Sequence, residues 1–267
     1  MALCRISKMG MVSALGEGAE ETWASCLKGG VPLSKTQDYL TGGQETMVGR
    51  VIDLAPLPPQ WKQLDSKNNR LAYAAYLQIQ DQVEQALAIY PKQRIALVMG
   101  TSTGGMLETE HAFFNHPLGQ PTPDFSYPVN EISSLGKVLG EMIGVAGPCY
   151  TIATACSSSA NAIISGARLL ESGLMDAVIV GGVDSLCKMT TNGFNSLGLL
   201  SSKQSIPFMK GREGLNIGEA AALALLERKP GGIQLKGYGQ SADAHHISAP
   251  DPQGKGAQAA MAKPRMK

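Results

Sequence analysis

The sequence has few aromatic residues (5%) and few charged residues (17%), and it contains no long hydrophobic run. A membrane-spanning helix needs about 18 or more consecutive apolar residues, so no segment is expected to cross a bilayer. The first ten residues, MALCRISKMG, carry positive charge, but no apolar segment follows them. We therefore expect no secretory signal.

Cysteine is also scarce and scattered. The five cysteines are odd in number and include no C-x-x-C pair. This spacing argues against a disulfide framework and against a thiolate zinc site. We therefore expect no metal and a reducing, cytoplasmic environment. The cysteines are Cys4, Cys26, Cys149, Cys156 and Cys187.

Neither sign of charge dominates, because the chain contains 23 Lys and Arg residues and 22 Asp and Glu residues, for a net charge of +1. This balance provides no indication of binding to nucleic acid or to an anionic membrane. The chain is instead rich in hydrophobic residues (43%) and contains 31 glycines. Such a composition is typical of a globular α/β protein with tight packing and a large core.

Residues 149–184 are predicted to form a strand, a helix and a second strand. Tyr150 and Ile152 belong to the first strand, and the serines 157–159 suit a helix N-terminus because hydroxyl groups can cap unpaired N–H groups. The apolar run 177–180 is typical of a strand buried on both faces. The two strands of such a unit are parallel.

Helical and strand patterns alternate along the rest of the chain, which predicts an α/β domain with a mostly parallel sheet flanked by helices. The longest helical pattern covers residues 65–89, and a buried strand covers residues 95–99. Residues 106–130 contain aromatic residues and prolines and are predicted to be a loop. No internal repeat or linker is visible.

Cys156 lies where the first strand of the 149–184 unit gives way to the helix. A thiol at a helix N-terminus is placed in the positive end of the backbone dipole, which favours the thiolate. Backbone N–H groups at the same turn can receive a developing oxyanion. The position therefore suits a nucleophile for acyl transfer. A buried, inert cysteine is the competing interpretation, because free cysteines are among the most buried residues.

Two glycine-rich stretches resemble nucleotide-binding motifs only loosely. Residues 100–105, GTSTGG, could cradle a phosphate, but no Lys-Ser/Thr pair follows, so a tight turn after a strand is the better interpretation. Gly237, Gly239 and Ala242 match G-x-G-x-x-A, but no helix pattern follows them. We do not expect a dinucleotide site.

A thiol nucleophile needs a base, and histidine is the usual one. The chain contains four histidines, at positions His111, His116, His245 and His246. Their spacing does not indicate which of them, if any, reaches Cys156. Surface or packing roles remain open for all four.

The stretch TACSSSANAI around Cys156, followed by DAVIVGGVDSL, resembles the active-site region of β-ketoacyl-acyl-carrier-protein synthases. These are the condensing enzymes of fatty-acid and polyketide synthesis. Further stretches resemble the family in the same order along the chain. They are MGMVSALGEGAEETW, GTSTGG, NGFNSLGLLS and IPFMKGREGLNIGEAAALALLE.

The resemblance implies the N-terminal half of a thiolase-like αβαβα sandwich. Residues 1–250 would form the synthase N-terminal domain, and 251–267 the beginning of a largely missing second half. The implied activity is a decarboxylative condensation. An acyl group is carried as a thioester on cysteine, and malonyl carrier protein then loses carbon dioxide and attacks it. The implied partners are acyl carrier protein, acyl and malonyl thioesters and a second synthase chain in a dimer. No cofactor is implied.

The resemblance also assigns residues. Cys156 would be the acylated nucleophile, with its own N–H as one oxyanion donor. Phe194 would line the acyl channel, with Gly104 and Gly105 nearby. Lys67 and Arg70 match basic positions that contact the acidic carrier protein, although a solvated helix start is an equal alternative.

The sequence departs from the family in several places. The two histidines and the lysine of the family's active site lie in motifs that this chain does not contain. Met209 replaces an aspartate, and Ala220 and Ala222 replace glycines. A catalytically silent remnant or a partner subunit is therefore the alternative function. A cysteine hydrolase is disfavoured because TACSSS lacks the glycines of a nucleophile elbow.

Overall fold

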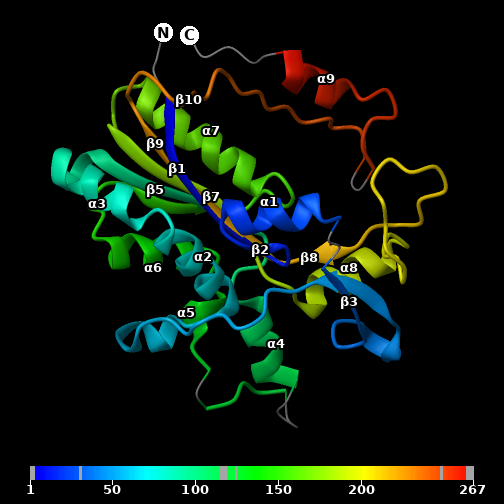
Figure 1. Ribbon diagram of the computed structural model, residues 1–267. Helices are drawn as coiled ribbons and strands as arrows, with labels where there is room; N and C mark the ends of the chain where they lie inside the picture. Colours follow the sequence, from blue (N-terminus) through cyan, green and yellow to red (C-terminus); the bar gives the residue numbers. More distant parts are fainter. Residues whose placement is uncertain (1–3, 30–31, 115–118, 124, 247–248, 263–267) are drawn as a thin grey trace.

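The computed structural model describes residues 4–29, 32–114, 119–123, 125–246 and 249–262 (Figure 1). Its strands are β1 (Arg5–Ser13), β2 (Gly16–Glu17), β3 (Leu33–Thr36), β4 (Thr46–Gly49), β5 (Ile95–Gly100), β6 (Cys149–Ile152), β7 (Ala177–Asp184), β8 (Ile217–Gly218), β9 (Ala220–Glu227) and β10 (Ile233–Gln234). Its α-helices are α1 (Ala19–Leu27), α2 (Lys67–Leu77), α3 (Gln80–Ile89), α4 (Met106–Phe114), α5 (Tyr127–Asn130), α6 (Ser134–Ile143), α7 (Ser158–Glu171), α8 (Lys188–Ser196) and α9 (Lys255–Ala262). Short 3₁₀ turns are η1 (Thr41–Gly43), η2 (Pro59–Leu64) and η3 (Lys92–Arg94).

The main sheet has the strand order β10-β1-β9-β7-β5-β6, with β2 paired to β1. Strand β5 is parallel to both of its neighbours, β6 and β7, which confirms the parallel strands predicted for the 149–184 unit. Strand β9 is antiparallel to both β7 and β1. The prediction of a mostly parallel sheet is therefore wrong in detail. The sheet is mixed because β9, which follows the 185–219 segment, runs antiparallel beside β7 instead of crossing over to a parallel position.

Helices cover both faces of this sheet. Alternate strand residues point to opposite faces, as a pleated strand requires. Leu97 and Ile179 pack into one core with helices α2, α3 and α6, whereas their neighbours Val98 and Val180 pack into a second core with α7. The buried strands β5 and β7 are apolar on both sides because a helix layer lies on each side.

Helix α7 packs unusually close to the sheet, and glycines make this possible. A Cβ atom on Gly100 of β5 would lie 2.4 Å from the carbonyl carbon of Ser158, and one on Gly182 of β7 would lie 2.3 Å from the Cβ of Ser159. A Cβ on Gly166, within the helix, would lie 2.4 Å from a methyl group of Val180. Gly173 then adopts a positive φ of 70° after the helix, a conformation typical of a helix end.

Several local expectations need correction. The long helical pattern over residues 65–89 is two helices, α2 and α3, because the chain leaves helical geometry at Ile79, where the side chain is fully buried. The predicted loop 106–130 contains helices α4 and α5. Strand β6 is at the sheet edge and only half-buried. Among the described residues, no helix has the length and apolar character needed to cross a membrane.

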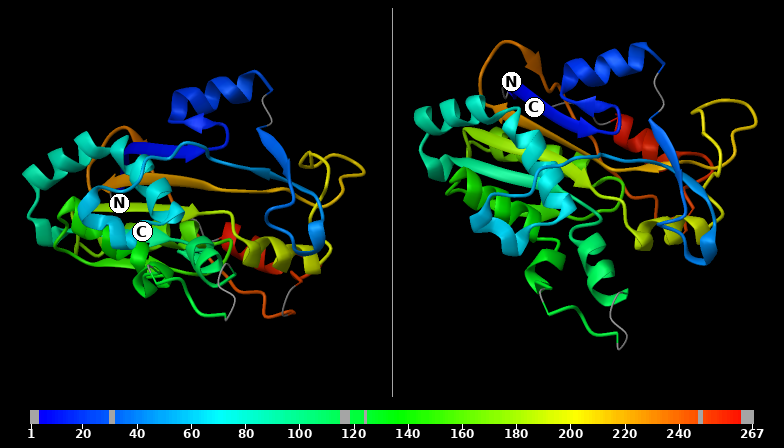
Figure 2. Two further views of the ribbon diagram at one scale, coloured as in Figure 1. Left: turned by 90° about the horizontal axis from the view of Figure 1, so that it is seen from below. Right: turned by 60° about the horizontal axis from the view of Figure 1, so that its bottom comes forward.

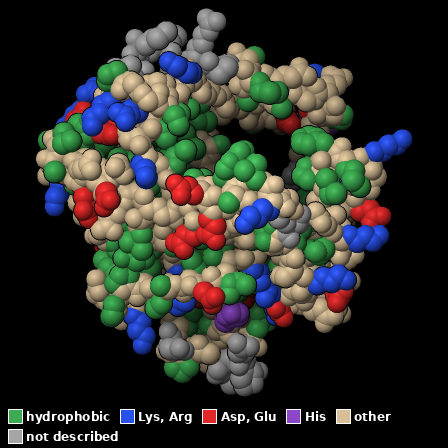
Figure 3. Space-filling model, viewed as in Figure 1, with side chains coloured by type: hydrophobic (Ala, Val, Ile, Leu, Met, Phe, Trp, Pro, Cys, Tyr) green, Lys and Arg blue, Asp and Glu red, His purple; other side chains and the backbone are tan. Residues whose placement is uncertain are grey.

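A second, three-stranded sheet with the order β3-β4-β8 lies beside the main sheet, near α8 (Figures 1 and 2). Val48 of β4 and Leu186, which follows β7, are fully buried in a small core that they share with Tyr39. On the face seen in Figure 3, the molecule is hollowed between its main body and the segment that ends in α9. Hydrophobic side chains surround that hollow.

The close approach of α7 gives a direct test. Replacing Gly100 with alanine should destabilise the fold by about 1–3 kcal/mol, because the added methyl group meets backbone atoms that have little freedom to move. Gly193, inside α8, provides the matched control, since a Cβ there would meet no atom within 4 Å. Alanine at 193 should be neutral or stabilising by about 0.5–1 kcal/mol, because glycine is a poor helix former. Urea unfolding would measure both, and equal stability of the two variants would contradict the packing described.

Candidate functional site

Cys156 lies on an exposed turn between β6 and α7. The turn is held by side-chain hydrogen bonds from the first residues of α7. The Ser158 hydroxyl accepts from the Thr154 N–H (2.9 Å) and donates to the Ala155 carbonyl (2.7 Å). The Asn161 amide donates to the Thr154 hydroxyl (2.9 Å). The sequence suggested that the serines cap the helix, but α7 has no side-chain cap. The serines instead stabilise the turn that precedes it.

The backbone is strained one residue before Cys156. Ala155 has a φ of 51°, in the left-handed region that residues with a Cβ rarely adopt. Such a conformation costs about 1–2 kcal/mol and persists only where the surroundings enforce it. Here the bonds made by Ser158 supply that constraint. Strain of this kind is common next to reactive side chains.

A cavity of about 420 Å³ opens beside Cys156. Its wall is made by the first residues of α7, the end of β7 and the beginning of β9. The lining residues are Gly100, Ala155, Cys156, Ser158, Ser159, Ile163, Gly181, Gly182, Val183, Asp184, Gly218, Ala220, Ala221 and Ala222. Most of them are small, so the thiol stands at the edge of an open space at the strand ends.

The remaining cysteines differ from Cys156 in their surroundings. Burial raises the pKa of the Cys4 thiol to about 11, and it also raises the pKa of Cys149 and of Cys187. Such thiols are poor nucleophiles near neutral pH, because the thiolate is the reactive form. Cys26 is exposed, but it lies in the last turn of α1 and does not line the cavity. Cys156 is thus the exposed cysteine that lies both at a helix start and beside a cavity.

The loop 100–105 is organised by a residue that the sequence did not single out, Asp184 at the end of β7. One oxygen of its carboxylate, Oδ1, accepts the N–H groups of Ser102 (2.7 Å) and Thr103 (3.1 Å). The same oxygen accepts three hydroxyl groups, from Thr101, Ser102 and Thr103. The Gly104 N–H donates to the Thr101 hydroxyl. Because these amides are already engaged, the loop does not form a phosphate cradle.

The residue predicted to line the acyl channel, Phe194, and the two predicted to lie near it, Gly104 and Gly105, are not lining residues of the cavity at Cys156. Gly104 and Gly105 are buried at the beginning of α4, where they pack against the 129–132 segment. A Cβ on Gly105 would lie 2.2 Å from the Val129 carbonyl oxygen. Phe194 is half-buried in α8 and is not a lining residue of this cavity.

The two basic residues predicted to contact a partner are both paired within the chain. The Lys67 ammonium lies 2.5 Å from the Glu219 carboxylate, whose side chain is fully buried. Arg70 makes a two-pronged contact with Asp65, with both N–O distances at 2.6 Å. The Arg70 side chain is 36% exposed and that of Lys67 is 24% exposed. Lys67 therefore has a clear internal role that its position in the sequence did not reveal.

Further carboxylates hold main-chain segments together around the site. Glu219 accepts the N–H groups of Val51 (2.9 Å) and Leu186 (3.1 Å). Glu110 accepts the first two N–H groups of α8, those of Lys188 and Met189, each at 2.7 Å. In the sequence, Glu219 lies in the stretch GREGLNIGEAAA, where either a buried structural pairing or a solvated charge was open for it. The structure shows the buried pairing, whose partners are far away in the chain.

No histidine among the described residues lines the cavity at Cys156. His111 lies in the last turn of α4, and His245 and His246 lie in the segment that precedes α9. His116 is outside the described residues. The part of the chain that the structure describes also contains no group of three His, Cys, Asp or Glu side chains that could hold a metal ion.

Comparison with known proteins gives consistent matches. A family model described as "Beta-ketoacyl synthase, N-terminal domain" matches residues 6–231. Curated relatives include 3-oxoacyl-acyl-carrier-protein synthase 2 of Vibrio cholerae, 26% identical over 277 residues, with 96% of this chain and 67% of the relative covered. The Staphylococcus aureus enzyme of the same name is also 26% identical and is covered to 68%.

Solved structures agree. A ketosynthase in complex with its chain length factor from Xenorhabdus doucetiae matches with a TM-score of 0.91 and 41% identity, over 97% of this chain and 66% of that one. A β-ketoacyl synthase from Burkholderia phymatum matches with a TM-score of 0.82 and 20% identity, over 98% of this chain and 70% of that one. The chain thus spans about two thirds of the length of the relatives it matches.

The hydrogen bonds that the Asp184 carboxylate accepts from the 101–103 loop can be tested by mutation. Asp184→Ala removes the acceptor of five donors and should cost about 1–3 kcal/mol of stability. Amide hydrogen exchange at Ser102 and Thr103 should accelerate, because their acceptor is gone. Asp184→Asn is the matched control, since its carbonyl oxygen still accepts. Unchanged exchange in the alanine variant would show that the loop does not depend on this carboxylate.

Proposed function

This chain belongs to the β-ketoacyl synthase family, and from that premise we propose that Cys156 is the acyl-carrying nucleophile of a condensing enzyme in fatty-acid or polyketide-type synthesis. The observation that carries the proposal is the position of this exposed thiol on a strained turn at the start of α7, beside an open cavity. A nucleophile for acyl transfer needs both access for the thioester and nearby backbone donors.

The proposed reaction has two stages. In the first, the Cys156 thiolate attacks the carbonyl carbon of an acyl thioester, and the carrier's thiol leaves with a proton. In the second, a malonyl thioester loses carbon dioxide, and the resulting carbanion attacks the acyl–Cys156 carbonyl. The Cys156 thiolate is then released, and the product is longer by two carbons. The N–H of Cys156 would donate to the oxyanion in both stages, and Phe194, Gly104 and Gly105 would border the acyl channel.

The surroundings of Cys156 suggest that the two stages differ greatly in rate for this chain. The described residues that line the cavity include no histidine or lysine. General acid–base catalysis is worth about 10²–10⁴-fold, and each oxyanion donor about 10²–10³-fold. Acylation needs only the thiolate and a donor, whereas decarboxylation also needs charge stabilisation at the malonyl group. A catalytically silent partner chain is the alternative function. The presence of a cysteine at position 156 argues against this alternative.

We propose acyl carrier protein as one partner and a second synthase chain as another. Strand β6 lies at the edge of the main sheet, where one row of its backbone groups is unpaired within the described chain. Such an edge suits pairing with another chain. Among the matched structures, one is of a ketosynthase in complex with its chain length factor and one is of a ketosynthase in complex with an acyl carrier protein.

The first stage can be measured separately from the second. Incubation with an acyl carrier protein thioester should add one acyl group to the chain, detectable by intact-mass analysis, and Cys156→Ala should abolish the adduct. Cys26→Ala is the control, because Cys26 is the other exposed cysteine, and it should leave the adduct unchanged. With malonyl carrier protein added, we expect condensation to be at least about 10²-fold slower than acylation. An adduct that persists in Cys156→Ala would rule out this residue as the nucleophile.

Substitutions of Arg70 and Lys67 should affect different properties of the chain, binding of the carrier protein and stability of the fold respectively. Arg70→Gln should weaken binding of an acidic carrier protein roughly two- to fivefold at low salt, as expected for a partly exposed ion pair. Lys67→Gln should instead lower stability by roughly 2–3 kcal/mol, because it leaves the buried Glu219 carboxylate without its cation. Lys92→Gln is the binding control, because Lys92 is an exposed lysine in η3, directly before the first residue of β5. Equal binding by the Arg70 and Lys92 variants would exclude Arg70 from the contact.

A further inference from the structure

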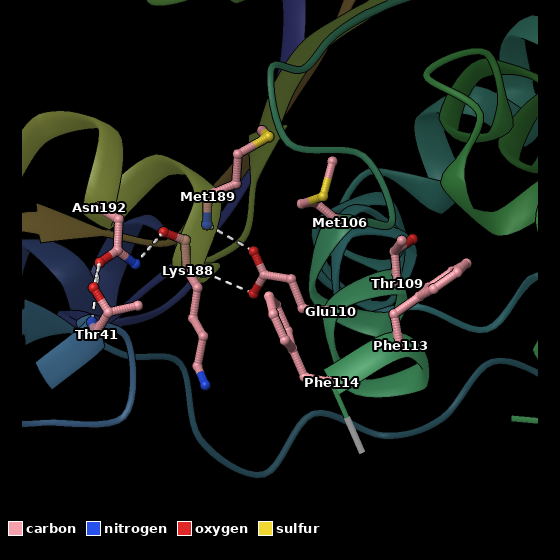
Figure 4. Close-up of a pocket in the computed structure, with 9 residues that line it drawn as sticks. All are labelled: Thr41, Met106, Thr109, Glu110, Phe113, Phe114, Lys188, Met189 and Asn192. Atoms are coloured by element: carbon pink, nitrogen blue, oxygen red, sulfur yellow. Dashed lines mark hydrogen bonds between the residues drawn. The ribbon is translucent and has the colours of Figure 1, made fainter. Parts of the chain in front are cut away.

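Asp184 uses one of its two carboxylate oxygens to hold the chain together. All five donors of the 101–103 loop converge on Oδ1. Glu219 and Glu110 differ, because each accepts N–H groups with both oxygens, and Figure 4 shows this for Glu110 and the beginning of α8. The second oxygen of Asp184, Oδ2, accepts no hydrogen bond from any described residue.

The charge of Asp184 has no cation beside it. Within the described part of the chain, no lysine or arginine forms an ion pair with this side chain. The side chain is half-buried. An aspartate carboxylate carries a full negative charge near neutral pH, so an unpaired oxygen of this kind acts on whatever approaches it.

This carboxylate belongs to the wall of the cavity at Cys156. Asp184 is the last residue of β7, and it lines the cavity of about 420 Å³ together with the thiol. It is the one charged residue among the described lining residues, which are otherwise glycine, alanine, serine, cysteine, valine and isoleucine. The space that an electrophile enters to reach Cys156 therefore has one fixed charge, and that charge is negative.

The register of β7 places the carboxylate on the same side of the sheet as the thiol. Val180 packs into the core beneath α7, and a Cβ on Gly182 would lie 2.3 Å from the Cβ of Ser159 in the first turn of that helix. Alternate residues of a strand point to one face, so Asp184 follows Val180 and Gly182 toward α7. The close packing of α7 thus keeps the carboxylate and the thiol on one cavity.

We propose that Asp184 determines which electrophiles react with Cys156, admitting neutral acyl groups and rejecting anionic ones, the malonyl group above all. This inference deepens the function proposed for Cys156 and rests on it. In a malonyl thioester the carboxylate is two bonds from the carbonyl carbon that the sulfur attacks. It must therefore approach the edge of the cavity that Asp184 lines, where a like charge provides selection by repulsion.

The size of the effect follows from the charges. Two like charges about 8 Å apart reduce a rate by roughly thirtyfold at an effective dielectric constant of about 20, and by roughly twofold in water. An effect of roughly three- to tenfold is expected for a cavity that solvent can enter. Added salt should reduce it.

Such selection matters for the proposed reaction. In the first stage the Cys156 sulfur bonds to the carbonyl carbon of a thioester, the bond from that carbon to the leaving sulfur breaks, and the leaving thiol takes the proton that Cys156 lost. A malonyl group transferred in this way would occupy the thiol and leave no acyl chain to extend. Asp184 would keep Cys156 for the neutral acyl group and leave the malonyl group on its carrier.

Alkylation of the intact chain tests the charge effect without any synthase chemistry. Iodoacetamide is neutral and iodoacetate is anionic, and each alkylates a thiolate with loss of iodide. The iodoacetate-to-iodoacetamide rate ratio at Cys156, measured by peptide mass spectrometry, should rise roughly three- to tenfold in Asp184→Asn. Asparagine keeps a carbonyl oxygen for the loop donors. The exposed Cys26 is the reference in the same sample, and its ratio should not change.

Two further variants separate the local charge from other effects. Glu141→Gln removes an equal charge from an exposed position on α6 and should leave the ratio at Cys156 as it is in the parent chain. Ala222→Lys adds a cation at an exposed position of the cavity wall, with Asp184 still in place, and should raise the ratio. This variant tests the proposal even if Asp184→Asn does not fold.

Thioester loading then tests the selection itself. With butyryl- and malonyl-N-acetylcysteamine as acyl donors, the malonyl-to-butyryl ratio of adducts on Cys156 should rise roughly three- to tenfold in Asp184→Asn, as measured by intact mass. Alkylation ratios that are equal in the parent chain, Asp184→Asn and Ala222→Lys would overturn the proposal. A shifted alkylation ratio with an unchanged malonyl-to-butyryl ratio would overturn it as well. If the alkylation ratio shifts but neither thioester loads in any variant, the charge effect is supported and the function proposed for Cys156 is wrong.

Discussion

The hydrogen bonds that buried and half-buried carboxylates accept from the main chain are the interaction on which the candidate site depends. Asp184 holds the loop after β5, Glu219 joins the segments after β4 and β7, and Glu110 holds the start of α8. Each bond has a carboxylate oxygen as its acceptor, and hydrogen bonds of this charge-assisted kind are stronger than neutral ones. The segments that leave the strand ends are irregular, and these carboxylates satisfy N–H groups that no helix or sheet would satisfy.

The glycines at the strand ends complete this arrangement. Because Gly100 and Gly182 carry no side chain, the first turn of α7 approaches the ends of β5 and β7 closely, and Cys156 is brought to the rim of a cavity made of small residues. The strained Ala155 backbone is compatible with the same packing, since Ser158 and Asn161 brace the turn. The thiol's exposure is therefore a consequence of rigid packing beneath it.

Much of the fold follows from local patterns. The apolar runs at residues 95–99 and 177–180 are buried strands, because helices cover both faces of the sheet there. The break between α2 and α3 was not visible in the sequence, because Ile79 fits the helical pattern of apolar residues. In the structure the chain leaves helical geometry at Ile79, and its side chain is buried in the core. The loop predicted at 106–130 was wrong, because α4 buries Ala112 and Glu110, and Glu110 accepts two N–H groups of α8.

The sequence by itself determined the family, the strand–helix–strand unit and the position of Cys156 at a helix start, because these depend on short-range spacing. Only the tertiary structure decided the mixed sheet, the pairing of Lys67 with Glu219 and the role of Asp184. Lys67 and Glu219 are far apart in the chain, as are Asp184 and the loop at 101–103. No local pattern marks such pairs, because the hydrogen-bond or charge partner of each side chain lies on a segment that only folding brings near.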